Sequence, residues 1–100
     1  MKLFTLEQFA AHLNETFMVS IEGDGRTPFV LVEARPMSKD ERMIPGMMRA
    51  PFSLLFRNES AIVFPQKIYP MTHDALGEFG IFLVPIARDK QGFIYQALFN

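Results

Sequence analysis

The sequence predicts a mainly β domain of the α+β class, in which about six antiparallel strands form a barrel or roll with one N-terminal helix. Runs of alternating apolar and polar residues recur along most of the chain, and turn-forming stretches such as GDGR and RDKQG separate them. The clearest helical periodicity occurs near the N-terminus. Hydrophobic residues make up 49% of the 100 residues, which fits one core and a single domain over 1–100. A helix packed on an open sheet is the alternative architecture.

The first predicted element is a helix that begins after Thr5. Thr5 is a suitable N-cap, Gln8 stands three residues later as in a capping box, and Phe4 and Phe9 are placed as a hydrophobic staple. His12 lies at the margin of the apolar stripe and is expected to be a solvated flanking residue. The stripe expected to cover the sheet consists of Leu6, Phe9, Ala10 and Leu13.

The predicted strands follow the period of two. They cover 16–22, 27–35, 50–58 and 93–100, with a hairpin inside 67–85, while 60–66 is either a short strand or a connector. Alternation predicts that Phe52, Leu54 and Phe56 share one face of their strand. It predicts the same for the last strand, whose shared face would hold Phe93, Tyr95, Ala97 and Phe99.

The segment KIYPMTHDALGEFGIFLVP, residues 67–85, is open to two interpretations. As a hairpin with DALG as a four-residue loop, it pairs His73 with Glu78 and Tyr69 with Phe82, and the polar residues merely serve the turn. Alternatively, His73 is the general base of a hydrolase or isomerase, oriented by Asp74 or Glu78. The second interpretation lacks a nucleophile in a recognisable motif, so the first is favoured.

A long irregular segment, residues 36–50, separates the second and third predicted strands. Its methionines offer an adaptable apolar surface, so loop 37–50 either plugs one end of the barrel or binds a small apolar ligand. The candidate ligand or partner contacts are Met43, Met47, Met48, Tyr69 and Phe82.

Composition argues against several classes of function. The net charge of −1 with interspersed signs disfavours nucleic acid and anionic membranes as partners, and no run reaches the length of a membrane span. The chain has no cysteine, which suits the cytoplasm. Two histidines far apart in the sequence match no metal-ligand spacing, so neither a metal nor another cofactor is expected.

Three blocks, FSLLFR at 52–57, PQKIYPMTHDALGEFGIFLVP at 65–85 and YQALFN at 95–100, resemble an uncharacterised family of small bacterial proteins with only a domain-of-unknown-function label. The N-terminal LFTLEQFAAHLNETFMV is similar too. The resemblance implies no activity, but it suggests a link to phage-tail-like structural proteins. The longer, Met-rich middle segment departs from the commoner form of the family.

These observations favour a non-catalytic protein-interaction or assembly module. More strand surface is apolar than one short helix could cover, so a symmetric homodimer is expected, formed through an apolar sheet face or a strand edge. The surplus apolar positions are Val30, Val32, Phe82, Val84, Ile94 and Leu98. A small apolar-ligand binding domain and an enzyme using His73 are the two alternatives.

Overall fold

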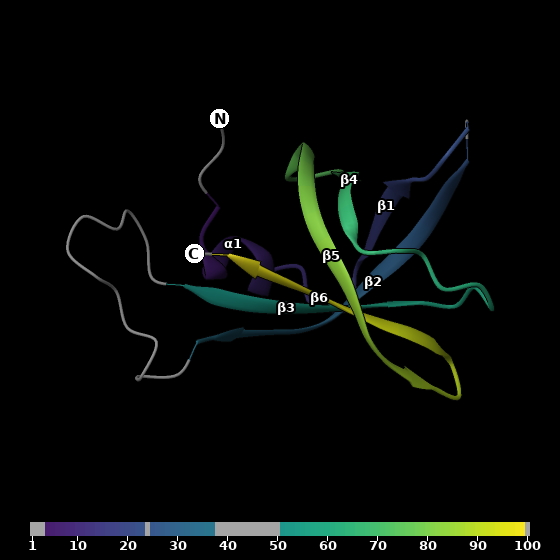
Figure 1. Cartoon of the computed structure of the whole chain (residues 1–100). Coiled ribbons are helices and arrows are strands. Elements are labelled where there is room, and N and C mark those ends of the chain that lie inside the picture. Colours follow the sequence, from purple (N-terminus) through teal and green to yellow (C-terminus); the bar gives the residue numbers. More distant parts are fainter. Residues whose placement is uncertain (1–3, 24, 38–50, 100) are drawn as a thin grey trace.

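Six antiparallel strands close into a barrel, and one short helix lies at one end of it (Figure 1). This computed structural model describes residues 4–23, 25–37 and 51–99. Within them, the predicted mainly β fold with about six strands and one N-terminal helix is confirmed. The strand order around the barrel is β1-β2-β3-β6-β5-β4. The elements are α1 (Leu6–Ala10), β1 (Thr16–Ser20), β2 (Arg26–Pro36), β3 (Phe52–Asn58), β4 (Lys67–His73), β5 (Gly77–Asp89) and β6 (Gly92–Phe99).

The barrel interior is filled by side chains that point inward from all six strands. Alternate positions of each strand are buried, as the period of two predicted, and β3 buries Phe52, Leu54 and Phe56 on one face. On β6, Tyr95 and Ala97 are buried while Phe93 and Phe99 pack against the same core. The other inward residues are Phe17, Val19, Phe29, Leu31, Tyr69, Met71, Ile81 and Leu83.

Helix α1 begins as the sequence predicted. The Thr5 side chain accepts a hydrogen bond from the Gln8 backbone N–H, and the Gln8 side chain accepts one from the Thr5 N–H, which completes the capping box. Phe9 is fully buried at the end of the barrel, where its ring contacts the ring of Phe99 from the end of β6. The predicted four-residue stripe was too long: Ala10, the last residue of the helix, is exposed, and Leu13 is exposed because it lies beyond the end of the helix.

The predicted register of the β4–β5 hairpin was wrong by one residue. The loop has three residues, 74–76, and Gly77 pairs with His73 while taking the positive φ of +80°. A glycine in this conformation closes a three-residue loop as readily as it ends a four-residue one, so the sequence left both registers open. The shift puts Tyr69 opposite Ile81 on the inward face and turns Phe82 outward, opposite Ile68.

Residues 59–66 connect β3 to β4 without forming a strand. Three buried polar side chains hold this connector on the barrel. The Tyr95 hydroxyl accepts a hydrogen bond from the Phe64 N–H at 2.8 Å, and the Tyr69 hydroxyl donates one to the Pro65 carbonyl. Asn58 accepts one from the Ser60 N–H and donates to Thr27 and Pro28 of β2.

No helix in the described part of the chain combines the length and the apolar character that crossing a membrane requires.

Candidate functional site

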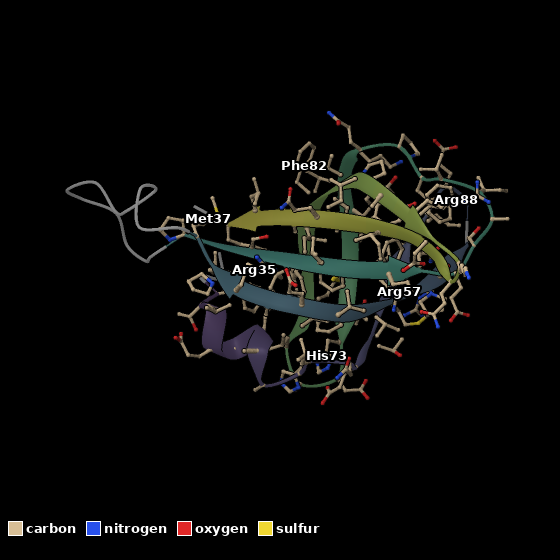
Figure 2. The ribbon with its side chains drawn as sticks, turned by 90° about the horizontal axis from the view of Figure 1, so that it is seen from below. Arg35, Met37, Arg57, His73, Phe82 and Arg88 are labelled. Atoms are coloured by element: carbon tan, nitrogen blue, oxygen red, sulfur yellow. The ribbon has the colours of Figure 1, made fainter. Side chains whose placement is uncertain are left out.

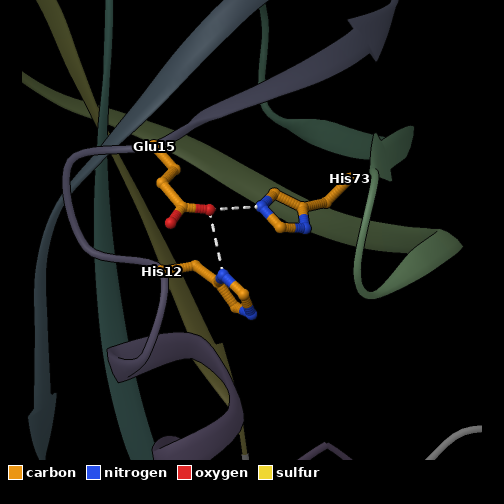
Figure 3. Close-up of side chains that lie close together, drawn as sticks. All are labelled: His12, Glu15 and His73. Carbon is orange, nitrogen blue, oxygen red and sulfur yellow. Dashed lines mark hydrogen bonds and ion pairs between the residues drawn. The ribbon is translucent and has the colours of Figure 1, made fainter.

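Three ionisable side chains from distant parts of the sequence converge at one place on the barrel (Figure 3). Glu15 stands just before β1, His12 lies between α1 and Glu15, and His73 is the last residue of β4. One carboxylate oxygen of Glu15, Oε1, lies 2.9 Å from Nδ1 of His12 and 2.8 Å from Nε2 of His73. We call these three residues the His–Glu–His cluster.

Closure of the barrel is what brings the cluster together. Strands β1 and β4 pair at Met18 with Thr72, which places Phe17 beside His73 with their ring centroids 4.4 Å apart. Glu15 is held by the β1–β2 ladder, because the Leu31 N–H donates to its carbonyl. Asn14 adopts a positive φ of +68°, and this turn lets the chain leave α1 and enter β1 with His12 beside Glu15.

The hydrogen bonds of His73 define which of its ring nitrogens carries the proton. The backbone N–H of Ala75 donates to Nδ1 at 3.0 Å, so Nδ1 is an unprotonated acceptor. A neutral imidazole with an unprotonated Nδ1 carries its proton on Nε2, where it donates to Glu15. Both nitrogens of His73 are therefore hydrogen-bonded, and its one lone pair, on Nδ1, is occupied by the Ala75 N–H and is not free to act as a general base.

Glu15 accepts hydrogen bonds from both rings, and this controls its acidity. The bond from His73 and, to a smaller extent, the bond from His12 hold the pKa of the Glu15 carboxyl below its ordinary value of 4.5. The carboxylate is thus the anionic centre of the cluster. Its side chain is half-exposed, that of His12 is 22% exposed, and that of His73 is 6% exposed, so the cluster extends from the protein interior to the solvent.

The cluster opens into a cleft of about 580 Å³. Arg26 of β2 contributes a cationic side chain to this cleft, Asp74 an anionic one and Thr16 a polar one. Nε2 of His12 has no hydrogen-bond partner among the described residues and points away from Glu15 (Figure 3). The cleft thus combines two carboxylates, two imidazoles and one guanidinium.

The residues singled out from the sequence are distributed over the whole molecule. His73 belongs to the cluster and Asp74 lines its cleft, whereas Glu78 lies on β5 opposite Thr72 and does not line the cleft. Tyr69 is 2% exposed and Phe82 is 48% exposed. The remaining candidates, Met43, Met47 and Met48, lie outside the described residues.

Sequence reasoning missed His12, Glu15 and Arg26. His12 and Glu15 are three residues apart, and His73 is 58 residues beyond Glu15, so only the pairing of β1 with β4 brings them together. One signal was present: Glu15 directly precedes a strand whose first inward residue is Phe17. If the closed barrel and the three-residue hairpin loop had also been predicted, the position of Glu15 directly before β1 would have placed it near His73.

A second feature is an apolar surface on the outside of β4, β5 and β6, well separated from His73 (Figure 2). Ile68 and Phe82 pair directly across β4 and β5 and are 68% and 48% exposed. Leu98 of β6 is 51% exposed and stands two residues beyond Gln96, which pairs with Val84 of β5. We call the surface formed by Ile68, Phe82 and Leu98 the outer apolar face.

Comparison with known protein families gives one match. A family model described as a domain of unknown function, DUF6916, matches residues 4–99. The chain belongs to this family. The DUF6916 match spans α1 and all six strands, which confirms the resemblance to an uncharacterised family. No curated protein and no solved structure matches the chain.

Proposed function

We propose that this DUF6916 domain is a non-catalytic interaction and assembly module that self-associates as a symmetric dimer through the outer apolar face. The observation that carries the proposal is the placement of Ile68, Phe82 and Leu98. These three large apolar side chains come from neighbouring strands and are each about half-exposed or more. Scattered single apolar residues are normal on protein surfaces, but adjoining exposed ones, as Ile68 and Phe82 are across β4 and β5, are typical of an interaction site.

The surroundings of this face favour a second copy of the chain as the occupant. The outward positions next to the three side chains are uncharged and include Pro70, Gly80 and Gln96. A surface without charge can pack against itself in a two-fold arrangement without bringing like charges together or burying unpaired ones. A binding partner with a strongly charged surface would gain no ion pair here.

Closure of the barrel favours contact through a sheet face over contact through a strand edge. Every strand of the closed barrel has a neighbouring strand on each side, so no strand stands at the end of the sheet, although β1 and β4 pair only at Met18–Thr72 and Val19–Met71. We therefore propose contact between sheet faces. The interior of the barrel is filled by the buried aromatic and aliphatic side chains, so a small apolar ligand inside the barrel gains no support from the described residues.

The size of the apolar contact implies a weak dimer. Fully burying a Leu, Ile or Phe side chain contributes about 1.5–3 kcal/mol. Because the three side chains are half-exposed, completing their burial in both protomers contributes about 5–9 kcal/mol in all. Loss of translational and rotational freedom opposes association by about 4–15 kcal/mol. At the most favourable end of these ranges the balance is about −5 kcal/mol, which corresponds to a dissociation constant of about 0.2 mM, as suits a module that assembles within a larger structure.

The proposed setting follows from the family resemblance and the composition. We propose that the dimer acts in the bacterial cytoplasm during assembly of phage-tail-like structures. The absence of cysteine is compatible with a reducing compartment.

Sedimentation velocity over a range of concentrations tests the dimer. We expect the wild-type chain to be monomeric at about 10 µM and largely dimeric by about 1 mM. The variant Phe82→Ser should remain monomeric, whereas Ile62→Ser should behave as wild type, because Ile62 is 70% exposed but lies on the β3–β4 connector. A wild-type chain that stays monomeric, or an equal loss of dimer in both variants, would refute the proposal. If the chain associates with another protein but never with itself, the proposed dimer is contradicted and the outer apolar face binds a different partner.

A further inference from the structure

We propose that the His–Glu–His cluster is a binding site for a divalent transition-metal ion of the zinc type, with at least one coordination position open to the cleft. This inference is independent of the dimer, because the cluster and the outer apolar face lie on separate parts of the barrel (Figures 2 and 3).

The donor atoms are of the kind that zinc prefers. Two imidazole nitrogens and one carboxylate oxygen form a common three-ligand set for zinc, and nitrogen donors disfavour calcium and magnesium. One ligand atom from each of His12, Glu15 and His73 lies within 4.8 Å of the others. Around a tetrahedral zinc ion with bonds of about 2.0–2.1 Å, neighbouring donor atoms stand about 3.3 Å apart. The cluster is therefore close to the required size before any ion enters.

The side chains that are able to move can adjust the distances between the three ligand atoms to those around a zinc ion. The Glu15 oxygen lies 2.8 and 2.9 Å from the two nitrogens, distances set by the protons between them. An ion in place of these protons requires the oxygen to move slightly away from both nitrogens, and the two nitrogens, which lie up to 4.8 Å apart, to approach each other. His73 is fixed by its contact with Phe17 and by the hairpin, whereas Glu15 and His12 are exposed enough to shift.

Metal binding requires a proton to move on each ring. An ion on Nε2 of His73 displaces the proton there, and the neutral ring then carries a proton on Nδ1, which no longer accepts the Ala75 N–H. Ala75 is exposed, so its N–H can donate a hydrogen bond to water instead. The loss of one such hydrogen bond lowers the affinity for the metal ion by about tenfold or less. In His12 the proton moves to Nε2, which faces the cleft and has no partner among the described residues.

Three protein ligands leave a fourth position free. In zinc proteins such an open position holds water or a bound molecule, whereas structural sites are closed by four protein ligands. Arg26 lines the same cleft, as does Asp74. A small anion that binds the metal and is neutralised by the guanidinium is the class of ligand that fits.

Isothermal titration of zinc into tag-free, chelator-treated protein tests the site. We expect one equivalent to bind. Glu15→Gln keeps an oxygen that accepts both N–H bonds but removes the anionic ligand, and His12→Ala removes one nitrogen. Each should weaken binding by at least about tenfold, because even groups that only support a ligand are worth about 10–100-fold. Glu78→Gln, in the same hairpin but outside the cluster, should bind as wild type.

Nitrogen-detected NMR of the wild-type protein gives a second readout that does not depend on the variants folding. Zinc should convert Nδ1 of His73 from an acceptor to a protonated nitrogen and shift the Ala75 amide signal. Saturable binding that Glu15→Gln weakens, together with this change at His73, would support the site. Absence of binding with zinc in large excess, binding unaffected by Glu15→Gln, or an unchanged His73 ring on zinc addition would each overturn it. In those cases the cluster is a hydrogen-bonded link between the N-terminal segment and the barrel only.

Discussion

Replacing Phe9 with alanine tests how the N-terminal segment is joined to the barrel. Phe9 is completely buried, and five other phenylalanine rings lie with their centroids 5.2–6.2 Å from its own. These neighbours come from the chain before α1, from β1, from β5 and from the facing ends of β3 and β6: Phe4, Phe17, Phe79, Phe52 and Phe99. A single side chain thus joins the short helix to four strands.

The expected loss of stability follows from this environment. Deleting a buried phenylalanine ring in a protein core costs about 3–5 kcal/mol. Aromatic pairs contribute about 0.5–1.5 kcal/mol beyond their buried area, so five neighbours place Phe9→Ala near the upper end of that range. A domain of this size is stable by about 5–15 kcal/mol, and the variant should therefore retain only part of its stability.

Urea unfolding followed by circular dichroism measures this loss. With a slope of about 1–2 kcal/mol per molar urea, the midpoint for Phe9→Ala should fall by about 2–4 M at an unchanged slope. Leu13→Ala is the matched control, because Leu13 follows in the same segment but is 44% exposed, and it should lose less than about 1 kcal/mol. If Phe9→Ala does not fold, Phe9→Leu should lie between it and wild type. A loss below about 1.5 kcal/mol for Phe9→Ala, or equal losses for Phe9→Ala and Leu13→Ala, would show that Phe9 does not join the helix to the barrel.

Two further predictions concern the β5–β6 turn and the glycines. The ion pair with Arg57, and next the Gln91 N–H, hold the pKa of Asp89 below its ordinary value of 3.8. Wild type should therefore be more stable than Asp89→Asn above that pH, and the difference should vanish as the pH falls through the folded-state pKa; a difference independent of pH in urea titrations would contradict this. Gly92→Ala should cost about 2–5 kcal/mol, because φ is +143° and a Cβ would collide with the Asn58 carbonyl. Gly23→Ala, at φ +73° with open space around it, should cost only about 1–2 kcal/mol in the same assay, and equal losses would rule out the collision.

Local patterns in the sequence predicted most of the fold. The capping box at Thr5 and Gln8 depends on residues three apart, and strand alternation depends on neighbours two apart, so both are readable without tertiary information. The hairpin register was not readable, because Gly77 suits two loop lengths. The error of one residue in the predicted register exchanged the inward and outward faces of β5. It paired Phe82 with Tyr69, although in the structure the two side chains lie on opposite sides of the barrel wall.

The cluster depends on the long-range pairing of β1 with β4. His12 looked like an ordinary solvated residue, because nothing near it in the sequence indicates a second histidine. Its ring lies 4.4 Å from that of His73, which comes 61 positions later in the chain. The outer apolar face was partly foreseen: Phe82 and Leu98 were among the surplus apolar positions, whereas Val30, Val32, Val84 and Ile94 are half-buried. Ile68 was missed because the wrong register placed it opposite Leu83 rather than Phe82.

A dilution series followed by amide NMR tests the proposed assembly role most directly, because it locates any self-association on the surface. As the protein is diluted from about 1 mM to about 10 µM, the amide signals of Ile68, Phe82 and Leu98 should shift together along one binding curve. Signals of Glu15 and His73 should stay constant, since the cluster lies away from the outer apolar face. Spectra that do not change with concentration, or changes centred away from β4, β5 and β6, would contradict the account.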